Sequence, residues 1–505
     1  MARRTFIAGS LSAAGLALAA CSNDSPGAGA SGGGANAPLS IMIPLFGTAP
    51  APDGAVHAAF EELVGRKLDI TWVPSGDYPD RMTVTMASGD VPQVLTVLGK
   101  DANFVQSAEA GAFWDLTEHL ERYPNLAVPD PETALAASVN GTQYGLFRRR
   151  PAMRATAVFR QDWLDELGLA LPETVDELRT VAEAFVTERP GGSENAGLEM
   201  SDWGATYGGD SPYEYLETWF GAPNGWGEQG GKLVPAFDTE EFFEAQRFMR
   251  ALRADGLMNA DFATMPAADL TSRFFSGGAG ISLTTDDLEQ YANLFEDADP
   301  GSGADYVGNA GNLLGPDGRR RAHPTTGYSG ILAISKQSVP TEDDLDAVLA
   351  VFSALNTEAG QLLRLGVEGV SYEPDGDYFA RLEGPEAETA IADGSQFIQL
   401  STNVGDLPNP LLAPRNEGFA QMSARREELR ARDLEDAVRN PALPFVSQTQ
   451  LSQGAVLSQI IGDARIKFIA GEIDEAGYKG EIARWHSTGG DDVISEVNEL
   501  YSQAQ

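Results

Sequence analysis

The sequence predicts an α/β fold with two large domains, each formed by a sheet covered with helices. Strand-like runs alternate with amphipathic helical stripes from Leu39 to Leu98, a pattern typical of a mainly parallel sheet. The same alternation resumes at Ala155. About 465 residues remain after the N-terminal segment described below, which is enough for two domains.

The first region contains three predicted strands separated by two helices. In chain order these are a strand at 39–44, a helix with an apolar stripe from Val56 to Val64, a strand at 68–73, a helix at 80–87 and a strand at 94–98. Between the first strand and the first helix lies a loop rich in Gly, Pro and Ala. This order predicts a β-α-β-α-β unit.

The second region begins with a predicted strand at 155–159 and a short helix at 161–168 that ends at Gly168. Thr174 and Glu177 form a capping box that opens a further helix. More helices are predicted at 242–252 and after Thr341. From about Gln396 the chain is expected to be mostly helical with loops.

Two basic stretches, 148–154 and 319–327, each contain proline and lead into a strand-like run. They fit two interpretations. Each is either a crossing between domains or an ordinary surface loop, and the sequence does not separate these.

The N-terminal residues have the features of an export signal. Arg3 and Arg4 precede an apolar run that is too short to span a membrane and that ends in the lipobox 18–21. We expect a signal peptide at 1–20, twin-arginine export, and lipidation at Cys21 followed by a flexible tether to residue 38. The alternative is an N-terminal apolar helix with a buried cysteine.

Composition excludes several function classes. The chain carries a formal net charge of −39, and such an acidic surface repels nucleic acid and anionic lipid. This suits an extracellular protein, although acidity can also reflect the habitat of the organism. Cys21 is the only cysteine, so neither an internal disulfide nor a cysteine metal cluster can form. The four histidines are far apart and do not have zinc-ligand spacing.

Several segments, in order along the chain, resemble the bacterial extracellular solute-binding proteins of ABC importers, in the branch tied to sugars and oligosaccharides. They are Ala-Ser-Gly-Asp-Val-Pro at 87–92, the stretch 160–174 continuing into a helix, Phe275 to Ile281, Gly327 to Ser335, and Gly366 to Gly369 with Tyr372. The match is loose beyond Tyr372.

The resemblance implies a two-lobed periplasmic-binding-protein-like fold with hinge crossings and a central ligand cleft. One lobe would contain 39–150 plus about 323–375, and the other 155–320 plus about 396–505. It further implies that the chain captures a carbohydrate and delivers it to ABC transporter permease subunits. The carbohydrate expected is an oligosaccharide. The protein would be a monomer held outside the cytoplasmic membrane by its lipid, without a cofactor.

A sugar site needs flat aromatic side chains beside fixed donors and acceptors. The stretch 202–226 is the densest candidate, because it combines aromatic residues with a helix start at Ser211 that has its own capping box. The predicted ligand-binding residues there are Trp203, Tyr207, Asp210, Ser211, Tyr213 and Trp226. Trp219 and Phe220 are expected to be core residues instead.

Further contacts are expected from loops at the carboxyl ends of strands, where α/β folds bind ligands. The candidates are Phe46, Asp90, Asp286 and Tyr328. Some oligosaccharide-binding relatives carry a calcium loop where this chain has 187–197. That stretch lacks the alternating oxygen ligands of a calcium loop, so no metal is expected there.

An enzyme is the rival hypothesis. The sequence has no Gly-x-Ser-x-Gly elbow and no P-loop. However, its many carboxylates leave room for the acid pair of a glycosidase or lyase. Capture of a non-sugar solute such as a peptide, or a surface role without a transporter, also stays open.

Overall fold

The computed structural model describes residues 37–127, 130–192, 194–357, 360–376, 378–402 and 417–504. Every described residue belongs to one compact unit. The predicted signal peptide, Cys21 and most of the tether lie outside the described residues. No described helix is both long enough and apolar enough to cross a membrane.

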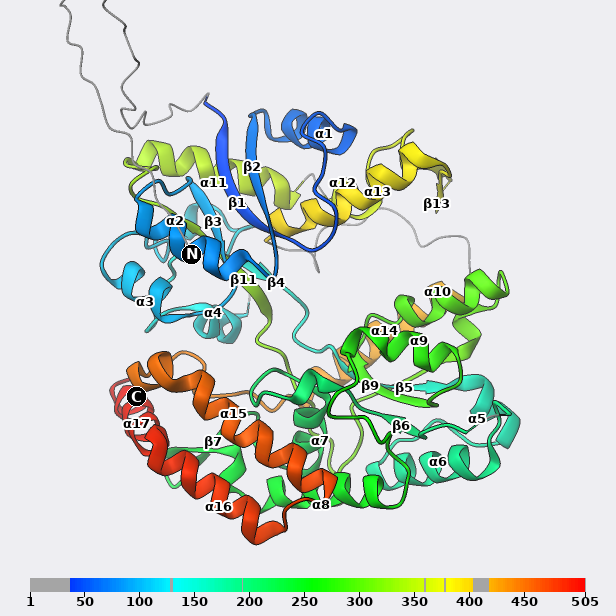
Figure 1. Cartoon of the computed structure of the whole chain (residues 1–505). Helices are drawn as coiled ribbons and strands as arrows, with labels where there is room; N and C mark the ends of the chain where they lie inside the picture. The colour runs from blue at the N-terminus through cyan, green and yellow to red at the C-terminus, as the bar shows by residue number, and fades with distance from the viewer. Residues whose placement is uncertain are drawn as a thin grey trace, which may run out of the picture. The chain divides into compact units, whose positions relative to one another are not determined.

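The first sheet has five strands in the order β2-β1-β3-β11-β4 (Figure 1). Its strands are β1 Leu39–Leu45, β2 Leu68–Pro74, β3 Val94–Val97, β4 Leu146–Arg149 and β11 Tyr328–Ile334. β1 is parallel to β2 and β3, whereas β11 is antiparallel to both β3 and β4. The three predicted strands of this region are confirmed, and the sheet is completed by a strand from far downstream.

Helices cover both faces of this sheet, because its strands alternate apolar residues between two cores. Ile41 and Leu332 belong to one core and Met42 and Ala333 to the other. The helices are α1 Ala55–Val64, α2 Tyr78–Ser88, α3 Ala102–Glu109, α4 Pro131–Ala137, α11 Glu342–Thr357, α12 Gly360–Leu365 and α13 Pro385–Phe397, with short turns at His119–Arg122 and Ile398–Leu400. A hairpin of β12 Tyr372–Asp375 and β13 Tyr378–Arg381 precedes α13. Phe397 and Leu400 also pack in the first of these cores, so this sheet recruits residues beyond 375.

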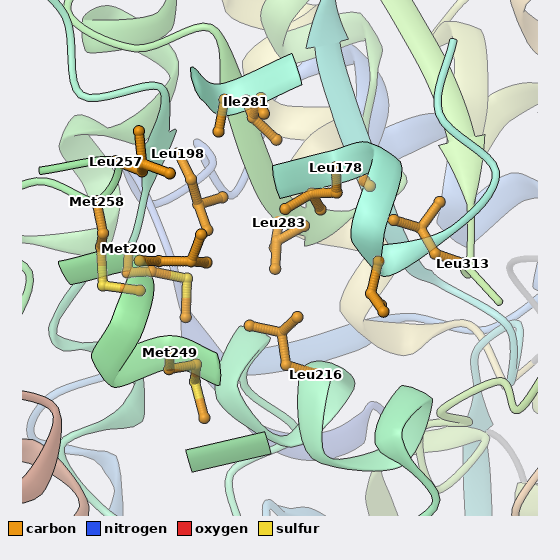
Figure 2. Close-up of a cluster of buried hydrophobic side chains, with 14 of the residues drawn as sticks. Leu178, Leu198, Met200, Leu216, Met249, Leu257, Met258, Ile281, Leu283 and Leu313 are labelled. Atoms are coloured by element: carbon orange, nitrogen blue, oxygen red, sulfur yellow. The ribbon is translucent and has the colours of Figure 1, made fainter. Parts of the chain in front are cut away.

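The second sheet has four strands in the order β10-β5-β9-β6. They are β5 Ala155–Arg160, β6 Leu198–Glu199, β9 Ile281–Thr285 and β10 Val307–Gly311. β5 runs antiparallel to both of its neighbours, so this sheet is less parallel than the sequence predicts. Figure 2 shows its core, where Leu198, Ile281 and Leu283 meet Leu178 and Leu216 from the flanking helices.

The helices around the second sheet are α5 Gln161–Leu167, α6 Val175–Glu188, α7 Pro212–Phe220, α8 Glu240–Ala254, α9 Leu270–Phe275, α10 Glu289–Ala298 and α14 Glu417–Glu435. Short turns lie at Asp202–Gly204, Ala236–Asp238, Ala267–Asp269 and Gly303–Tyr306. The capping box at Thr174 is confirmed, since Thr174 Oγ1 accepts from Glu177 N–H and the Glu177 carboxylate accepts from Thr174 N–H. Trp219 is fully buried in this core, as expected.

The C-terminal part is helical, as predicted. α15 Gln448–Ala470, α16 Glu475–Trp485 and α17 Asp491–Gln503, with a π-helical turn His486–Gly490, share a core with the hairpin of β7 Trp226–Gln229 and β8 Lys232–Pro235. α15 packs against α8 and α16.

The two basic stretches lie side by side and connect the sheets. Arg150 N–H donates to Gly327 O, and Thr325 N–H donates to Ala152 O, both at 2.9 Å. The first stretch leads from β4 to β5 and the second from β10 to β11, so each passes from one sheet to the other. They are crossings rather than ordinary surface loops.

Candidate functional site

Three adjoining cavities lie along residues 439–445, and all three are bordered by Asn440 and Leu443. Their volumes are about 300, 100 and 380 Å³. We call them together the junction hollow. Its walls come from α4, the second crossing, the start of α7, the β7 strand and the C-terminal helices.

The first cavity, of about 300 Å³, has aromatic walls. Tyr207, Trp226, Phe237, Phe445 and Trp485 line it, with Gln450, Ser447 and Ser458 as polar neighbours. The Tyr207 ring meets Phe237 edge-on at 5.5 Å. Burial raises the pKa of Tyr207 well above its usual value, so its hydroxyl stays protonated. That hydroxyl has no hydrogen-bond partner among the described residues.

The second cavity, of about 100 Å³, is polar and lies at the N-terminal end of α7. Asp210 Oδ1 lies 3.3 Å from His323 Nε2, and His323 Nδ1 lies 2.9 Å from Thr218 Oγ1. Asp210 has a φ of 50°, a left-handed conformation that non-glycine residues adopt at an energetic cost. This conformation places the Asp210 carboxylate beside the second crossing.

The third cavity, of about 380 Å³, is lined on one side by residues that pack with the first sheet and on the other by residues of the second crossing and the C-terminal part. Thr133, Leu135 and Ala136 of α4 belong with the first sheet, because α4 packs against β11. Thr325 and Arg439 face them. Lys100, just after β3, donates to Ala136 O and to Leu443 O, both at 2.7 Å. It therefore links α4 to the C-terminal part of the chain.

Three predicted site residues are brought together in the junction hollow. Tyr207 lines two of its cavities, Trp226 one and Asp210 one. One half of the predicted capping box at Ser211 is present, since Ser211 N–H donates to the Glu214 carboxylate, whereas Ser211 Oγ has no hydrogen-bond partner among the described residues. These residues share the loop before α7 and the strand after it, which explains why a single sequence stretch supplies them.

Ser211 and Tyr213 are fully buried instead of lining the hollow. Tyr213 lies on the face of α7 that packs into the second core, and its hydroxyl donates to Ser201 O at 3.1 Å. Neither residue presents surface to a ligand in this conformation. The helix start was predicted correctly, but the sequence did not show which side of the first turn faces the core.

Four other predicted residues line none of the cavities that form the junction hollow. Phe46 follows β1 and is 57% exposed. Asp90 precedes β3, so it lies at the edge opposite to the carboxyl end of the parallel strand β1. Trp203 is half-buried with its Nε1–H on Gly209 O, and Tyr328 is half-buried at the start of β11.

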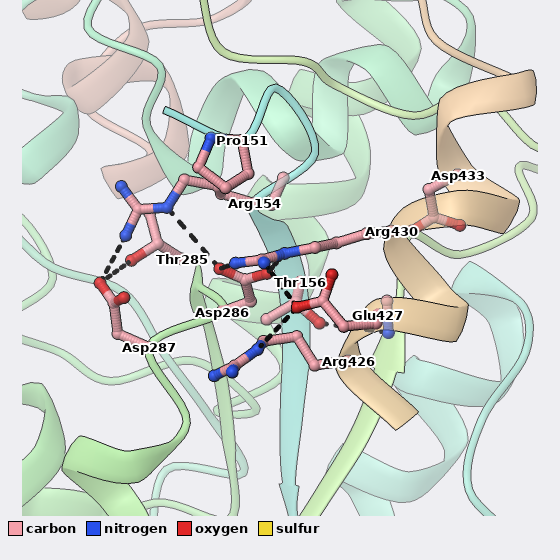
Figure 3. A network of polar contacts seen from close by, with 12 residues as sticks. Pro151, Arg154, Thr156, Thr285, Asp286, Asp287, Arg426, Glu427, Arg430 and Asp433 are labelled. Carbon is pink, nitrogen blue, oxygen red and sulfur yellow. Dashed lines mark hydrogen bonds and ion pairs between the residues drawn. The ribbon is translucent and has the colours of Figure 1, made fainter. Parts of the chain in front are cut away.

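Asp286 lies at the centre of an ion-pair network (Figure 3). It is 3% exposed and accepts two hydrogen bonds from the Arg430 guanidinium of α14, and Arg154 Nε lies 3.6 Å away. Burial raises the pKa of Asp286, and Arg430 offsets only part of that shift. The network joins β9, the first crossing and α14, which makes Asp286 an anchor between elements.

Several residues of the hollow were missed by sequence reasoning, namely His323, Arg439, Asn440, Phe445 and Trp485. The segment 440–445 carries two prolines between helical stretches, a signal that a functional loop interrupts the C-terminal helices. Within the described residues, no group of three or more His, Cys, Asp or Glu side chains is arranged to hold a metal ion. The absence of calcium at 187–197 stays a prediction.

Comparison with known proteins identifies the family. A family model described as bacterial extracellular solute-binding protein matches residues 48–362. The chain belongs to this family. The solute-binding protein is 34% identical over 503 residues to lipoprotein LipO of Bacillus subtilis, covering 97% of each chain. It is 32% identical over 508 residues to the polygalacturonan/rhamnogalacturonan-binding protein YtcQ of the same species, covering 98% of this chain and 97% of YtcQ.

Solved structures confirm the two-lobed fold of this solute-binding protein. A solute-binding protein from Bifidobacterium longum infantis, described as binding HMO and associated with an ABC transporter, superposes with a TM-score of 0.70 at 18% identity, covering 92% of this chain and 98% of that one. The substrate-binding protein FusA of Streptococcus pneumoniae, in complex with kestose, gives 0.65 at 19% identity, covering 92% and 99%. These relatives are described as binding proteins rather than enzymes.

Proposed function

We propose that this protein captures an oligosaccharide outside the cell in the junction hollow and delivers it, unaltered, to an ABC importer. The aromatic faces of Trp226 and Tyr207 are suited to sugar rings, and Asn440 and Asp210 supply a donor and acceptors for hydroxyl groups. Two curated relatives are described as binding polysaccharide or fructooligosaccharide, the second of them within an ABC transporter.

One observation carries this proposal. The hollow is bordered by α4, which packs on the first sheet, and by the α7 start and C-terminal helices, which pack with the second. A solute held there contacts both lobes and therefore favours the closed form by the difference between its affinities for the closed and open forms. The lobe ranges of this proposal are 39–150 with about 323–375, and 155–320 with about 396–505, with the correction that Phe397 and Leu400 pack with the first sheet.

Calorimetric titration with defined oligosaccharides tests the proposal. Trp226→Ala is expected to weaken binding by about 1–3 kcal/mol, because it removes a large apolar face. Trp203→Ala is the matched comparison, since Trp203 lies in the same stretch but lines none of the three cavities. If Trp203→Ala weakened binding and Trp226→Ala did not, the ligand would lie elsewhere. Formation of shortened products during incubation would favour the enzyme hypothesis.

We also propose that the protein is a monomer exported through its twin-arginine signal and anchored by lipid at Cys21. The sequence of the lipobox supports the anchor, as does the relative described as a lipoprotein. In cells, Cys21→Ser is expected to move the protein from the detergent phase to the aqueous phase of a Triton X-114 extraction. Retention of the variant in the detergent phase would contradict the anchor.

A further inference from the structure

Three cations lie at one edge of the first sheet of this acidic chain, whose net charge is −39, and one of them is fully buried while the other two are half-buried. Lys100 follows β3, and Arg148 and Arg150 lie at the end of β4. Within the described residues none of the three forms an ion pair with a carboxylate, although carboxylates outnumber cations by 74 to 35 in the sequence. Buried charges in proteins are normally paired, or they bind a ligand.

The topology places these cations where a ligand would meet them. β11 is antiparallel to β3 and to β4, so β3 and β4 run in the same direction and their carboxyl ends share an edge. β11 separates them, which puts the two ends about 10 Å apart at the usual spacing between strands. Ligands of open α/β sheets bind at the carboxyl ends of strands.

This edge adjoins the junction hollow through neighbouring residues, although Lys100, Arg148 and Arg150 themselves line none of its three cavities. Two carbonyls that accept from Lys100 belong to Ala136 and Leu443, and both residues line the third cavity. Arg150 N–H bonds to Gly327 O, and the neighbouring Thr326 lines the hollow as well. A chain of sugar rings lying in the hollow can therefore extend along this edge.

Arg150 leaves most of its hydrogen-bonding capacity unused and, unlike Arg148, is partly exposed. Its Nη1 donates to Arg149 O at 2.8 Å, and its remaining N–H groups have no partner in the described part of the chain. The charged groups facing it are Arg154 and Asp287, and Arg154 Nη2 already pairs with Asp287 at 2.6 Å. Burial lowers the pKa of Arg150 to about 10, and repulsion by Arg154 adds to this. The guanidinium thus lacks an anion of its own.

Lys100 and Arg148 add positive potential to the same edge. Lys100 donates to three carbonyl oxygens, and burial lowers its pKa to about 8. Arg148 is 1% exposed, donates to Gln399, and has no partner for its Nε–H among the described residues. Neutral carbonyls and amides satisfy hydrogen bonds but do not neutralise charge, so these cations still favour a nearby anion.

We infer that the ligand is an oligosaccharide that carries carboxylate groups, with Arg150 binding one carboxylate and Lys100 and Arg148 attracting the acidic chain to this edge. The planar fork of arginine pairs two N–H groups with the two oxygens of a carboxylate. The inference rests on the proposed function and specifies its substrate class. The separation of about 10 Å between the strand ends is longer than one sugar ring, so it suits linked rings rather than a single sugar.

Calorimetric titration of the full chain with three probes of equal length tests the inference. The probes are an oligogalacturonide, its methyl ester, and the corresponding neutral galacto-oligosaccharide. The acid is expected to bind at least about tenfold more tightly than the ester, because the ester keeps the rings and loses the charge. Arg150→Gln is expected to lower affinity for the acid by about tenfold or more and to change affinity for the ester less than about twofold.

Two controls keep the test decisive. Arg122→Gln removes an arginine of the first lobe that pairs with Asp346 at 2.8 Å and is not at this edge, and it is expected to leave all affinities unchanged. Arg150→Lys keeps the charge without the fork and is expected to bind the acid with intermediate affinity. Equal binding of acid and ester would overturn the inference and leave oligosaccharide capture standing. Binding of none of the three probes would also overturn the inference, and titration with other oligosaccharides would then decide the proposed function.

Discussion

At the scale of single residues, Glu199 of β6 is an unusual buried group. It is 0% exposed, neither carboxylate oxygen has a hydrogen-bond partner among the described residues, and Arg273 Nε lies 3.9 Å away. Burial raises the pKa of Glu199 well above 4.5, and Arg273 offsets part of this. Above pH 4.5 the unfolded chain releases this proton while the native state retains it, so stability falls as pH rises.

Glu199→Gln is therefore expected to unfold at a temperature equal to or higher than that of the parent at pH 7.5. The amide has a similar shape and no charge to desolvate, so the advantage should shrink towards pH 5. Thermal unfolding across this range measures it, with Glu183→Gln on the exposed face of α6 as the control. A variant equally destabilised at both pH values would contradict the argument.

The contribution of His486 to stability also falls as pH rises, but for a different reason than that of Glu199. Its Nδ1 lies 2.7 Å from Asp491 and its Nε2 3.1 Å from Asp238. Partial burial lowers the pKa of His486, but the hydrogen bonds to the two carboxylates outweigh it and the net shift is upward. Its contribution is complete below the unfolded pKa and is lost as pH rises through the folded pKa. His486→Asn should flatten the decline of unfolding temperature between pH 6 and 8.

At the scale of elements, Arg465 fixes α15 against α7. Arg465 is 0% exposed, its Nη1 lies 3.0 Å from Glu214 and 3.2 Å from Glu217, and its Nη2 donates to Gly204 O. Burial raises the pKa of Glu217 to about 8, even with Arg465 beside it. Removing one partner of such a group leaves buried charge without compensation.

Arg465→Met is accordingly expected to lower the free energy of unfolding by about 3–5 kcal/mol. Urea denaturation monitored by circular dichroism measures the loss. Lys467→Met, at an exposed position of the same helix, is expected to change it by less than about 0.5 kcal/mol. Similar effects of the two substitutions would show that the buried ion pairs contribute nothing specific.

Helix starts were predicted correctly where residues close together in the sequence determine them. The capping box at Thr174 and the Ser211–Glu214 pair marked helix starts because both partners lie within one turn of the chain. The orientation of Tyr213 was not predictable, because the position of the core relative to α7 depends on α15, which lies more than 200 residues downstream. The role of Asn440 in the hollow was missed for the same reason.

At the scale of the whole molecule, the two lobes followed from sequence order and resemblance, but the shared hollow did not. Tyr207, Asp210 and Trp226 were predicted because they lie within 20 residues of one another. In the hollow, α4 lies across from Arg439, and Lys100 bonds to Leu443. Each of these pairs joins segments that are more than 300 residues apart in the sequence. Such pairings leave no periodicity or spacing in the sequence.

The net charge of −39 predicts how the whole molecule responds to salt. Self-repulsion opposes the compact state, and added salt screens it. The unfolding temperature is expected to rise when sodium chloride increases from 20 to 500 mM, concentrations over which the screening length falls from about 20 to about 4 Å. A falling temperature would show that attractive ion pairs outweigh the repulsion.

The position of β11 has a consequence for biosynthesis. This strand lies between β3 and β4, yet it is translated about 180 residues after β4. As the nascent chain leaves the ribosome, the first sheet therefore has an open gap with two unpaired edges, which are prone to misassociation. The strands of the second sheet, by contrast, are all present once residue 311 has emerged. The first sheet can therefore be completed only after the strands of the second sheet have been synthesised.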